Sequence, residues 1–261
     1  MARTSRSCFG VALALALPAT AAAQHPEIAK RRSAEQKTFT DAQIVEGFFK
    51  LALGSEFQMS GRSDRIRKFD GPVRIFVDNR GKPNRSKQVA EVAADIQRRV
   101  EHIDLAIIET RAAANVRVVL VRDRDLSKTI QSTYGPERAR RIQKALMPQC
   151  LSMFRRNETF RIVEAEAILV TDAGEFVFYD CAYEEILQAL GPINDDSSVP
   201  WSMFNDKVRM GFFGVYDQYI LNILYHPRIR PGMTRAEVEA VLPVVMPDVR
   251  SFVAKTNGLP P

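Results

Sequence analysis

The chain has 261 residues, with 46% hydrophobic residues, 26% charged residues and a formal net charge of +6. This length is sufficient for one domain to bury its own core. The arginines are scattered and are not interleaved with aromatic residues, which argues against a nucleic-acid-binding surface. After the first residues, no apolar run is long enough to span a bilayer of roughly 30 Å, which argues against an integral membrane segment.

The first 23 residues have the pattern of a signal peptide. Arg3 and Arg6 give a positively charged start, residues 8–18 form a short apolar core, and three alanines precede Gln24. The sequence therefore predicts cleavage after Ala23 and export of residues 24–261 to the periplasm or the medium. Without Arg3 and Arg6 the formal charge of +6 falls to +4.

Export leaves two cysteines, Cys150 and Cys181. An oxidising compartment and an even cysteine count favour a disulfide between them. The alternative is a pair of buried free thiols.

The order of the expected elements indicates one mixed α+β domain over residues 40–256. Residues 24–39 are polar and basic and are expected to form a flexible arm, and residues 257–261 a loose tail. Strands are predicted over residues 72–77, 115–121 and 160–170. Helices are expected to begin at Thr40, at Ser86 as an N-cap, at Gly135, near 216 and at Thr234; the first and the last of these have capping-box sequences.

The segment that follows the last predicted strand contains the most specific motif. Residues 175–179 fit either a further strand or the entry to a helix, and a helix that carries Glu184 and Gln188 on one face ends at Gly191 and Pro192.

This motif resembles that of the metzincin zinc proteases, H-E-x-x-H-x-x-G-x-x-H. Glu184, Gln188 and Asn194 stand at the positions of the three zinc-binding histidines, Glu185 at that of the general base, and Gly191 at that of the glycine. The resemblance implies a metzincin-like domain, with a twisted sheet, a central motif helix and C-terminal helices.

Two further positions are similar to that clan. Met203 lies nine residues after Asn194, close to where those proteases place the methionine of the turn below the metal. Asp217 lies eight residues before Tyr225, similar to the spacing in the C-terminal helix of matrix-metalloprotease-like enzymes.

The whole chain resembles a family of uncharacterised exported bacterial proteins, a domain of unknown function. The shared segments are Glu-Glu-x-x-Gln-x-Leu-Gly-x-x-Asn-Asp, Ser-x-Phe-Asn-Asp and Leu-Tyr-x-Pro followed by Gly-Met. They correspond here to residues 184–195, 202–206, 224–227 and 232–233. This resemblance implies a fold and brings no established activity.

The donor atoms at the motif positions do not suit zinc. Amide oxygens are weak, uncharged donors, and oxygen ligands suit Ca²⁺ or Mg²⁺ better. The histidines after the signal peptide, His25, His102 and His226, lie outside the motif positions. We therefore expect neither a metal nor another cofactor.

Three functions remain open. The first is a non-catalytic binding or scaffold protein of the cell envelope, whose partner is an envelope protein, a peptide or a cell-wall ligand. Its predicted cleft consists of Glu184, Gln188, Gly191, Asn194, Asp195 and Met203. The second is a peptidase-like hydrolase that uses Glu185 as general base, with an oxygen-ligated metal or none, in which Glu184, Glu185 and Asp195 form a carboxylate cluster. The third is a surface-binding module that recognises peptidoglycan or an envelope protein through the basic loop Arg62–Lys68. A purely structural role for Glu184 and Glu185 is the alternative to all three.

Overall fold

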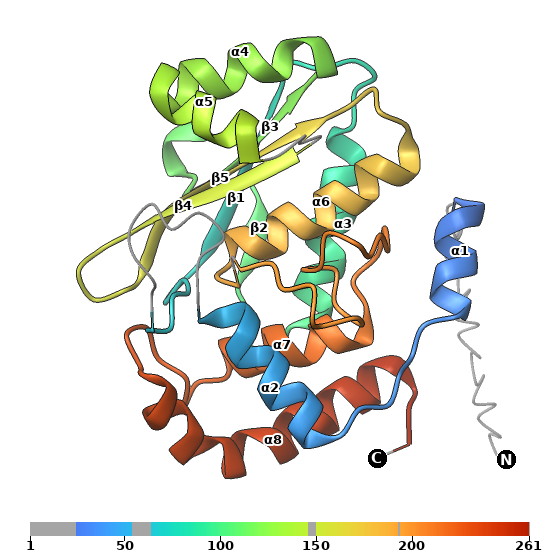
Figure 1. The fold of residues 1–261 in the computed structure, drawn as a ribbon, viewed down its shortest axis with the longest axis vertical. Helices are drawn as coiled ribbons and strands as arrows, with labels where there is room; N and C mark the ends of the chain where they lie inside the picture. The colour runs from blue at the N-terminus through green and yellow to red at the C-terminus, as the bar shows by residue number, and fades with distance from the viewer. Residues whose placement is uncertain (1–24, 54–63, 146–149, 193, 261) are drawn as a thin grey trace, which may run out of the picture.

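The computed structural model describes residues 25–53, 64–145, 150–192 and 194–260 (Figure 1). They form a mixed five-stranded sheet with strand order β2-β1-β3-β5-β4. The strands β1 Val73–Asn79, β2 Leu105–Ile107, β3 Val116–Val121 and β5 Ile162–Val170 run parallel. The strand β4 Cys150–Arg156 pairs antiparallel with β5 at one edge. The predicted α+β class is confirmed, whereas the predicted signal peptide lies outside the described residues.

Alternation along the strands divides the apolar side chains between two cores. In β3, Val116, Val118 and Leu120 point into the larger core, and Val119 and Val121 point into a smaller one, because successive side chains face opposite sides of a sheet. Both faces of β3 are therefore covered, which explains its nearly continuous apolar sequence.

Helices cover the two faces of the sheet unequally. The helices α3 Ser86–Arg99 and α6 Glu175–Ala189 pack against one face, and α4 Asp123–Tyr134 and α5 Pro136–Ala145 lie over the other (Figure 1). The helices α2 Asp41–Ala52, α7 Val215–Tyr225 and α8 Arg235–Asn257 form a further layer below α6, and every residue of α7 is buried.

Both capping-box predictions are confirmed. The Thr40 hydroxyl accepts the Gln43 amide while the Gln43 side chain accepts the Thr40 amide, and Thr234 and Glu237 make the same reciprocal pair. The prediction for Ser86 is wrong by one position: Arg85 is the N-cap residue, and the Asn84 side chain accepts the Ser86 amide at 2.9 Å.

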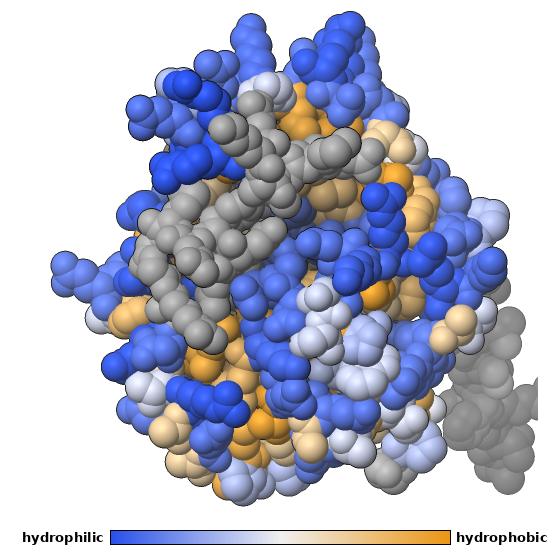
Figure 2. Space-filling model, in the orientation of Figure 1, coloured by the Kyte–Doolittle hydropathy of each residue, from blue (hydrophilic) through white to orange (hydrophobic). Residues whose placement is uncertain are grey.

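Sequence patterns also missed several elements with short apolar patterns. The strands β2 and β4 and the helix α4 have too few apolar residues on one face to stand out; α4 buries only Leu126, Thr129 and Ile130. Hydrophilic side chains predominate over α4 and α5 at the top of Figure 2. Of the two alternatives for residues 175–179, the structure shows the helical one: these residues form the start of α6.

The segment predicted as a flexible arm contains the helix α1 Pro26–Ser33. Its Ile28 side chain is buried, and the Arg32 guanidinium lies 4.7 Å from the centre of the Phe212 ring. At the other terminus, Asn257 belongs to α8, and its side-chain amide donates to the Gln218 side chain at 2.7 Å. Both segments are therefore tied to the body of the domain.

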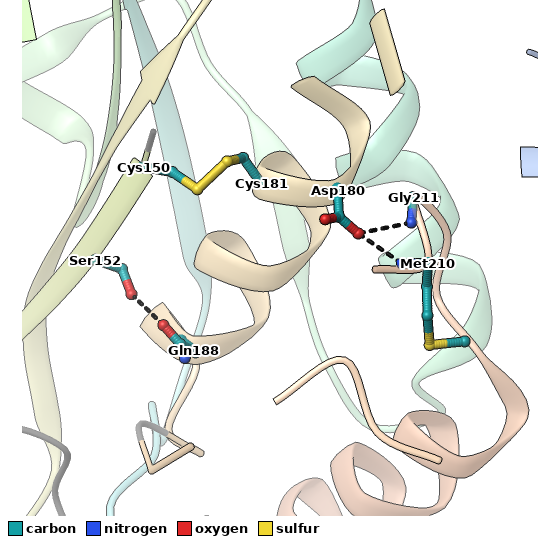
Figure 3. The surroundings of a disulfide bond; sticks show 7 residues. All are labelled: Cys150, Ser152, Asp180, Cys181, Gln188, Met210 and Gly211. Carbon is teal, nitrogen blue, oxygen red and sulfur yellow. Dashed lines mark hydrogen bonds between the residues drawn. A yellow bond between two sulfur atoms is a disulfide. The ribbon is translucent and has the colours of Figure 1, made fainter. Parts of the chain in front are cut away.

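The predicted disulfide is confirmed. Cys150 at the start of β4 and Cys181 in α6 are bonded, with their Cα atoms 5.8 Å apart (Figure 3). The bond joins the edge strand of the sheet to the helix that carries the motif.

We expect the double substitution Cys150→Ser and Cys181→Ser to lower the free energy of unfolding by about 3–4 kcal/mol, because the disulfide restricts a loop of roughly 30 residues in the unfolded chain. Urea unfolding of the oxidised wild type and the double variant measures the difference. A reductant should lower the unfolding midpoint of the wild type and leave that of the variant unchanged. Equal midpoints without reductant would contradict the prediction.

Candidate functional site

The helix α6 is held against the edge strand of the sheet at two positions along its length. Cys181 is bonded to Cys150, and two turns further along, the Gln188 side-chain oxygen accepts a hydrogen bond from the Ser152 hydroxyl at 3.2 Å (Figure 3). Cys150 and Ser152 share one face of β4 because they are two residues apart. The orientation of α6, and hence of its polar face, is therefore set by β4.

The end of α6 requires glycine at position 191. Gly191 has a φ of 143°, and a Cβ atom there would lie 2.4 Å from the Arg67 carbonyl oxygen and 2.9 Å from the Leu224 side chain. The preceding carbonyl, that of Leu190, accepts the Tyr225 hydroxyl at 2.9 Å. Gly191 thus acts through close packing of the chain.

Three carboxylates from different segments gather beside α6. Glu184 lies on the helix, Asp195 in the loop after it, and Asp206 in the loop before α7, and one oxygen of each lies within 4.8 Å of the others. Glu184 and Asp195 are half-buried and Asp206 is exposed. We call these three residues the carboxylate cluster.

The environment of Glu184 favours its protonated form. Burial raises the pKa of Glu184 well above its usual range, and the negative charges of Glu185, Asp195, Asp180 and Asp206 raise this pKa further. A carboxyl group of this kind can act as a proton donor or as a hydrogen-bond donor. The oxygens of the cluster could instead hold a hard cation such as Ca²⁺ or Mg²⁺, but they are a poor donor set for zinc.

Asp180 holds the loop that carries Asp206 and leads into α7. Its side chain accepts the backbone amides of Met210 and Gly211 at 2.6 and 2.9 Å (Figure 3). Burial raises the pKa of Asp180, which these two hydrogen bonds partly oppose. Sequence reasoning missed this residue, although Asp180, Glu184 and Gln188 follow the four-residue spacing of one helical face.

The predicted motif residues do not all meet. Gln188 joins the carboxylate cluster, because its amide nitrogen donates to Asp195 at 2.7 Å. The Asn194 amide donates instead to the Lys50 carbonyl of α2 at 2.7 Å. Glu185 is only 6% exposed, so the predicted general base is buried in the domain. Asp206 belongs to the carboxylate cluster but was not among the predicted cleft residues, although it lies in the Ser-x-Phe-Asn-Asp segment.

Met203 is held by a buried aspartate. The Asp217 side chain accepts the Ser202 hydroxyl at 2.6 Å and the Met203 amide at 3.0 Å. Met203 itself is buried in the larger core. Complete burial raises the pKa of Asp217 to about 7. This single side chain therefore ties the turn at residues 202–204 to α7.

The predicted basic loop is largely a structural element. Of its described residues, Arg67 and Lys68 are each 5% exposed. The Lys68 amine donates to the Leu224 and Ile229 carbonyls at 2.8 Å each, and Arg67 donates to the Ala52 carbonyl at 3.3 Å. These two cations cannot contribute to a surface that recognises peptidoglycan.

We expect Asp217→Asn to change how stability depends on pH. Since the pKa of Asp217 is about 7 in the folded chain and near 4 when unfolded, the folded state binds the extra proton, and this group's contribution to stability falls as pH rises from 4 to 7. Asparagine does not ionise, so it does not lose stability in this way. The unfolding free energy of the variant should therefore rise relative to that of the wild type by on the order of 4 kcal/mol between pH 4 and pH 7.

Urea unfolding at several pH values from 4 to 8 measures this difference. Asp64→Asn is the matched control, because the Asp64 side chain is 83% exposed. Parallel stability curves for the wild type and Asp217→Asn would contradict the prediction.

Comparison with known proteins places the chain in a family. Among the residues that the structure describes, no helix is both long and apolar enough to cross a membrane. No curated protein and no solved structure matches the chain. A family model described as "Protein of unknown function (DUF2927)" matches residues 41–244. The chain therefore belongs to the DUF2927 family of proteins of unknown function.

Proposed function

We propose that this protein is an exported, non-catalytic, metzincin-like protein that binds a partner in the cell envelope. This proposal rests on the hydrogen bonds that the side-chain amides of two motif residues make within the protein. Gln188 is hydrogen-bonded on both sides, to Ser152 and Asp195, and Asn194 is hydrogen-bonded to Lys50. Side chains at the positions of zinc ligands are thus engaged within the protein, which supports a motif helix that serves as a scaffold.

Two observations support export. The Cys150–Cys181 disulfide is consistent with an oxidising compartment, because cytosolic thiols are generally kept reduced. The charged, apolar and small-residue pattern of residues 1–23 is that of a signal peptide.

The carboxylate cluster indicates the chemistry of the partner. Glu184, Asp195 and Asp206 gather acidic groups beside α6. Since Glu184 favours its protonated form, the negative charge offered to a partner comes from the two aspartates, of which Asp206 is exposed. A peptide or cell-wall ligand that carries an amino or guanidinium group would be attracted to this charge.

We expect the purified chain to bind lysine- or arginine-containing peptides and Asp206→Asn to weaken that binding by about threefold, because an exposed charge at the rim of a site contributes modestly. Fluorescence anisotropy with labelled basic and acidic peptides of equal length measures it. Binding of the basic peptide should weaken at high salt. Asp64→Asn controls for net charge, and equal affinity for both peptides would contradict the proposed chemistry.

The alternative function is a peptidase-like hydrolase with Glu185 as general base. The observation that favours it is the raised pKa of Glu184 beside Asp195, since a carboxyl group whose pKa is raised by burial and by neighbouring carboxylates can serve in acid–base catalysis. The burial of Glu185 weighs against its access to a substrate.

We expect the mature protein, purified without chelator or affinity tag, to carry no stoichiometric zinc and to leave casein and unstructured peptides intact. The reason is the donor set, which offers carboxylate and amide oxygens in place of imidazoles. Elemental analysis and a peptidase assay measure the two outcomes. Chelator-sensitive cleavage, or turnover that Glu185→Gln abolishes without changing Tm, would contradict the proposal and establish the hydrolase.

A further inference from the structure

The sheet face that points away from α6 is covered over only part of its length. Asp78, Val119, Ile168 and Leu151 lie side by side in register across four strands. The last three belong to the smaller core, beneath α4 and α5. These two helices therefore cover the part of the sheet that lies near the carboxyl ends of β3 and β5.

The next rows of the same face carry charged side chains. Two residues back along the strands, Arg117 pairs in register with Glu166, and beyond it Glu164 lies opposite Arg155. Arg117 and Glu166 form an ion pair, and Arg155 and Glu164 form another at 3.1 Å. The face thus changes from apolar to charged where the cover of α4 and α5 ends.

A cavity of about 460 Å³ lies at this boundary. Tyr134 at the end of α4 and Arg138 in α5 form one wall, and Arg111 belongs to the segment before β3. Phe76 and Met153 supply apolar surface from the sheet. This volume lies within the range of sites that hold small organic molecules.

The charges around the cavity do not balance. Four arginines and two glutamates line it: Arg111, Arg117, Arg138, Arg155, Glu164 and Glu166. Both glutamates are taken by ion pairs, and Glu166 also accepts the Tyr134 hydroxyl at 3.3 Å. Asp78 also acts on this set, because it pairs with Arg117 at 3.8 Å, but it pairs with Arg80 as well. The hydrogen bond from Arg80 and the charges of Arg117 and Arg111 lower the pKa of Asp78. Within the described part of the chain, no carboxylate lies within ion-pair distance of Arg111 or Arg138, so the cavity keeps a surplus of positive charge.

Arg138 has a buried donor without an acceptor. Its guanidinium lies over the Tyr134 ring, 5.4 Å from the ring centre. Its Nε atom is buried and makes no hydrogen bond with any described residue. Arg138 also lines the cavity, so its guanidinium charge lies beside any ligand bound there.

We propose that this cavity binds a small organic anion, a carboxylate or phosphate attached to an apolar or aromatic body. Arg138 and Arg111 take the anionic group, since a guanidinium presents paired donors to the oxygens of a carboxylate or phosphate. Tyr134, Phe76 and Met153 contact the apolar part. The site lies on the opposite face of the sheet from α6, so it is independent of the function proposed for the carboxylate cluster.

Isothermal titration calorimetry of the mature protein tests the proposal with four probes: benzoate, phenyl phosphate, inorganic phosphate and phenyltrimethylammonium. We expect benzoate or phenyl phosphate to bind, and the stronger of the two identifies the anionic group. Inorganic phosphate should bind more weakly because it lacks the apolar body, and the cation should not bind.

Three variants locate the site. Arg138→Gln should weaken binding of the aromatic anion at least about tenfold, because it removes both the charge and the paired donors. Arg111→Gln should also weaken it, and provides the test if Arg138→Gln fails to fold. Arg141→Gln is the matched control, because Arg141 is exposed on α5 and does not line the cavity.

Two results with the wild type would overturn the proposal: no binding of either aromatic anion at about 10 mM, which corresponds to less than roughly 3 kcal/mol of binding free energy, or inorganic phosphate binding as tightly as phenyl phosphate. Two results with the variants would also overturn it: an equal loss of affinity in Arg141→Gln and Arg138→Gln, or wild-type affinity in folded Arg138→Gln. The carboxylate cluster does not line the cavity, so Asp206→Asn should leave this titration unchanged.

Discussion

The docking of α6 on the edge strand β4 is the constraint on which the candidate site depends. A covalent bond and a hydrogen bond, both from one face of β4, fix the helix at Cys181 and at Gln188. Asp180, on the same helix, then fixes the loop that enters α7 through two backbone amides. Once these contacts are made, the carboxylates of Glu184, Asp195 and Asp206 come together even though their backbones belong to three different segments.

The arrangement gathers like charges that would otherwise repel. Glu184 responds with a raised pKa, and the pKa of Asp217, which is buried below the turn at Met203, is raised because burial removes its water. A neutral carboxyl keeps its hydrogen bonds at a smaller desolvation cost than an ionised one. Both groups therefore connect the packing of α6 and α7 to the pH of the surroundings.

The carboxylate cluster and the cavity differ in the sign of their charge. Carboxylates collect beside α6, and arginines exceed glutamates in the cavity next to α4 and α5. A half-buried pair of charged residues on the sheet, such as Arg117 and Glu166, is tolerated because its charges are paired. The surplus at Arg111 and Arg138 has no such pairing among the described residues, which is why a ligand is inferred there and why a basic partner is proposed at the carboxylate cluster.

The sequence by itself determined the features that depend on neighbouring residues: both capping boxes, the apolar strand β3, the cysteine pair and the helical motif with its terminal Gly191. It could not reveal β4 or α4, because their apolar patterns are short. These two elements are stabilised by contacts with β5 and the smaller core, which lie elsewhere in the chain. Of the predicted cleft residues, Glu184, Gln188 and Asp195 lie together in the structure, whereas Asn194 is hydrogen-bonded to Lys50. Asp206, which was not predicted, joins the cluster. The positions of Asn194 and Asp206 were decided by the tertiary structure. They depend on distances between segments that are far apart in the chain, and the spacing of residues within one helix gives no information about those distances.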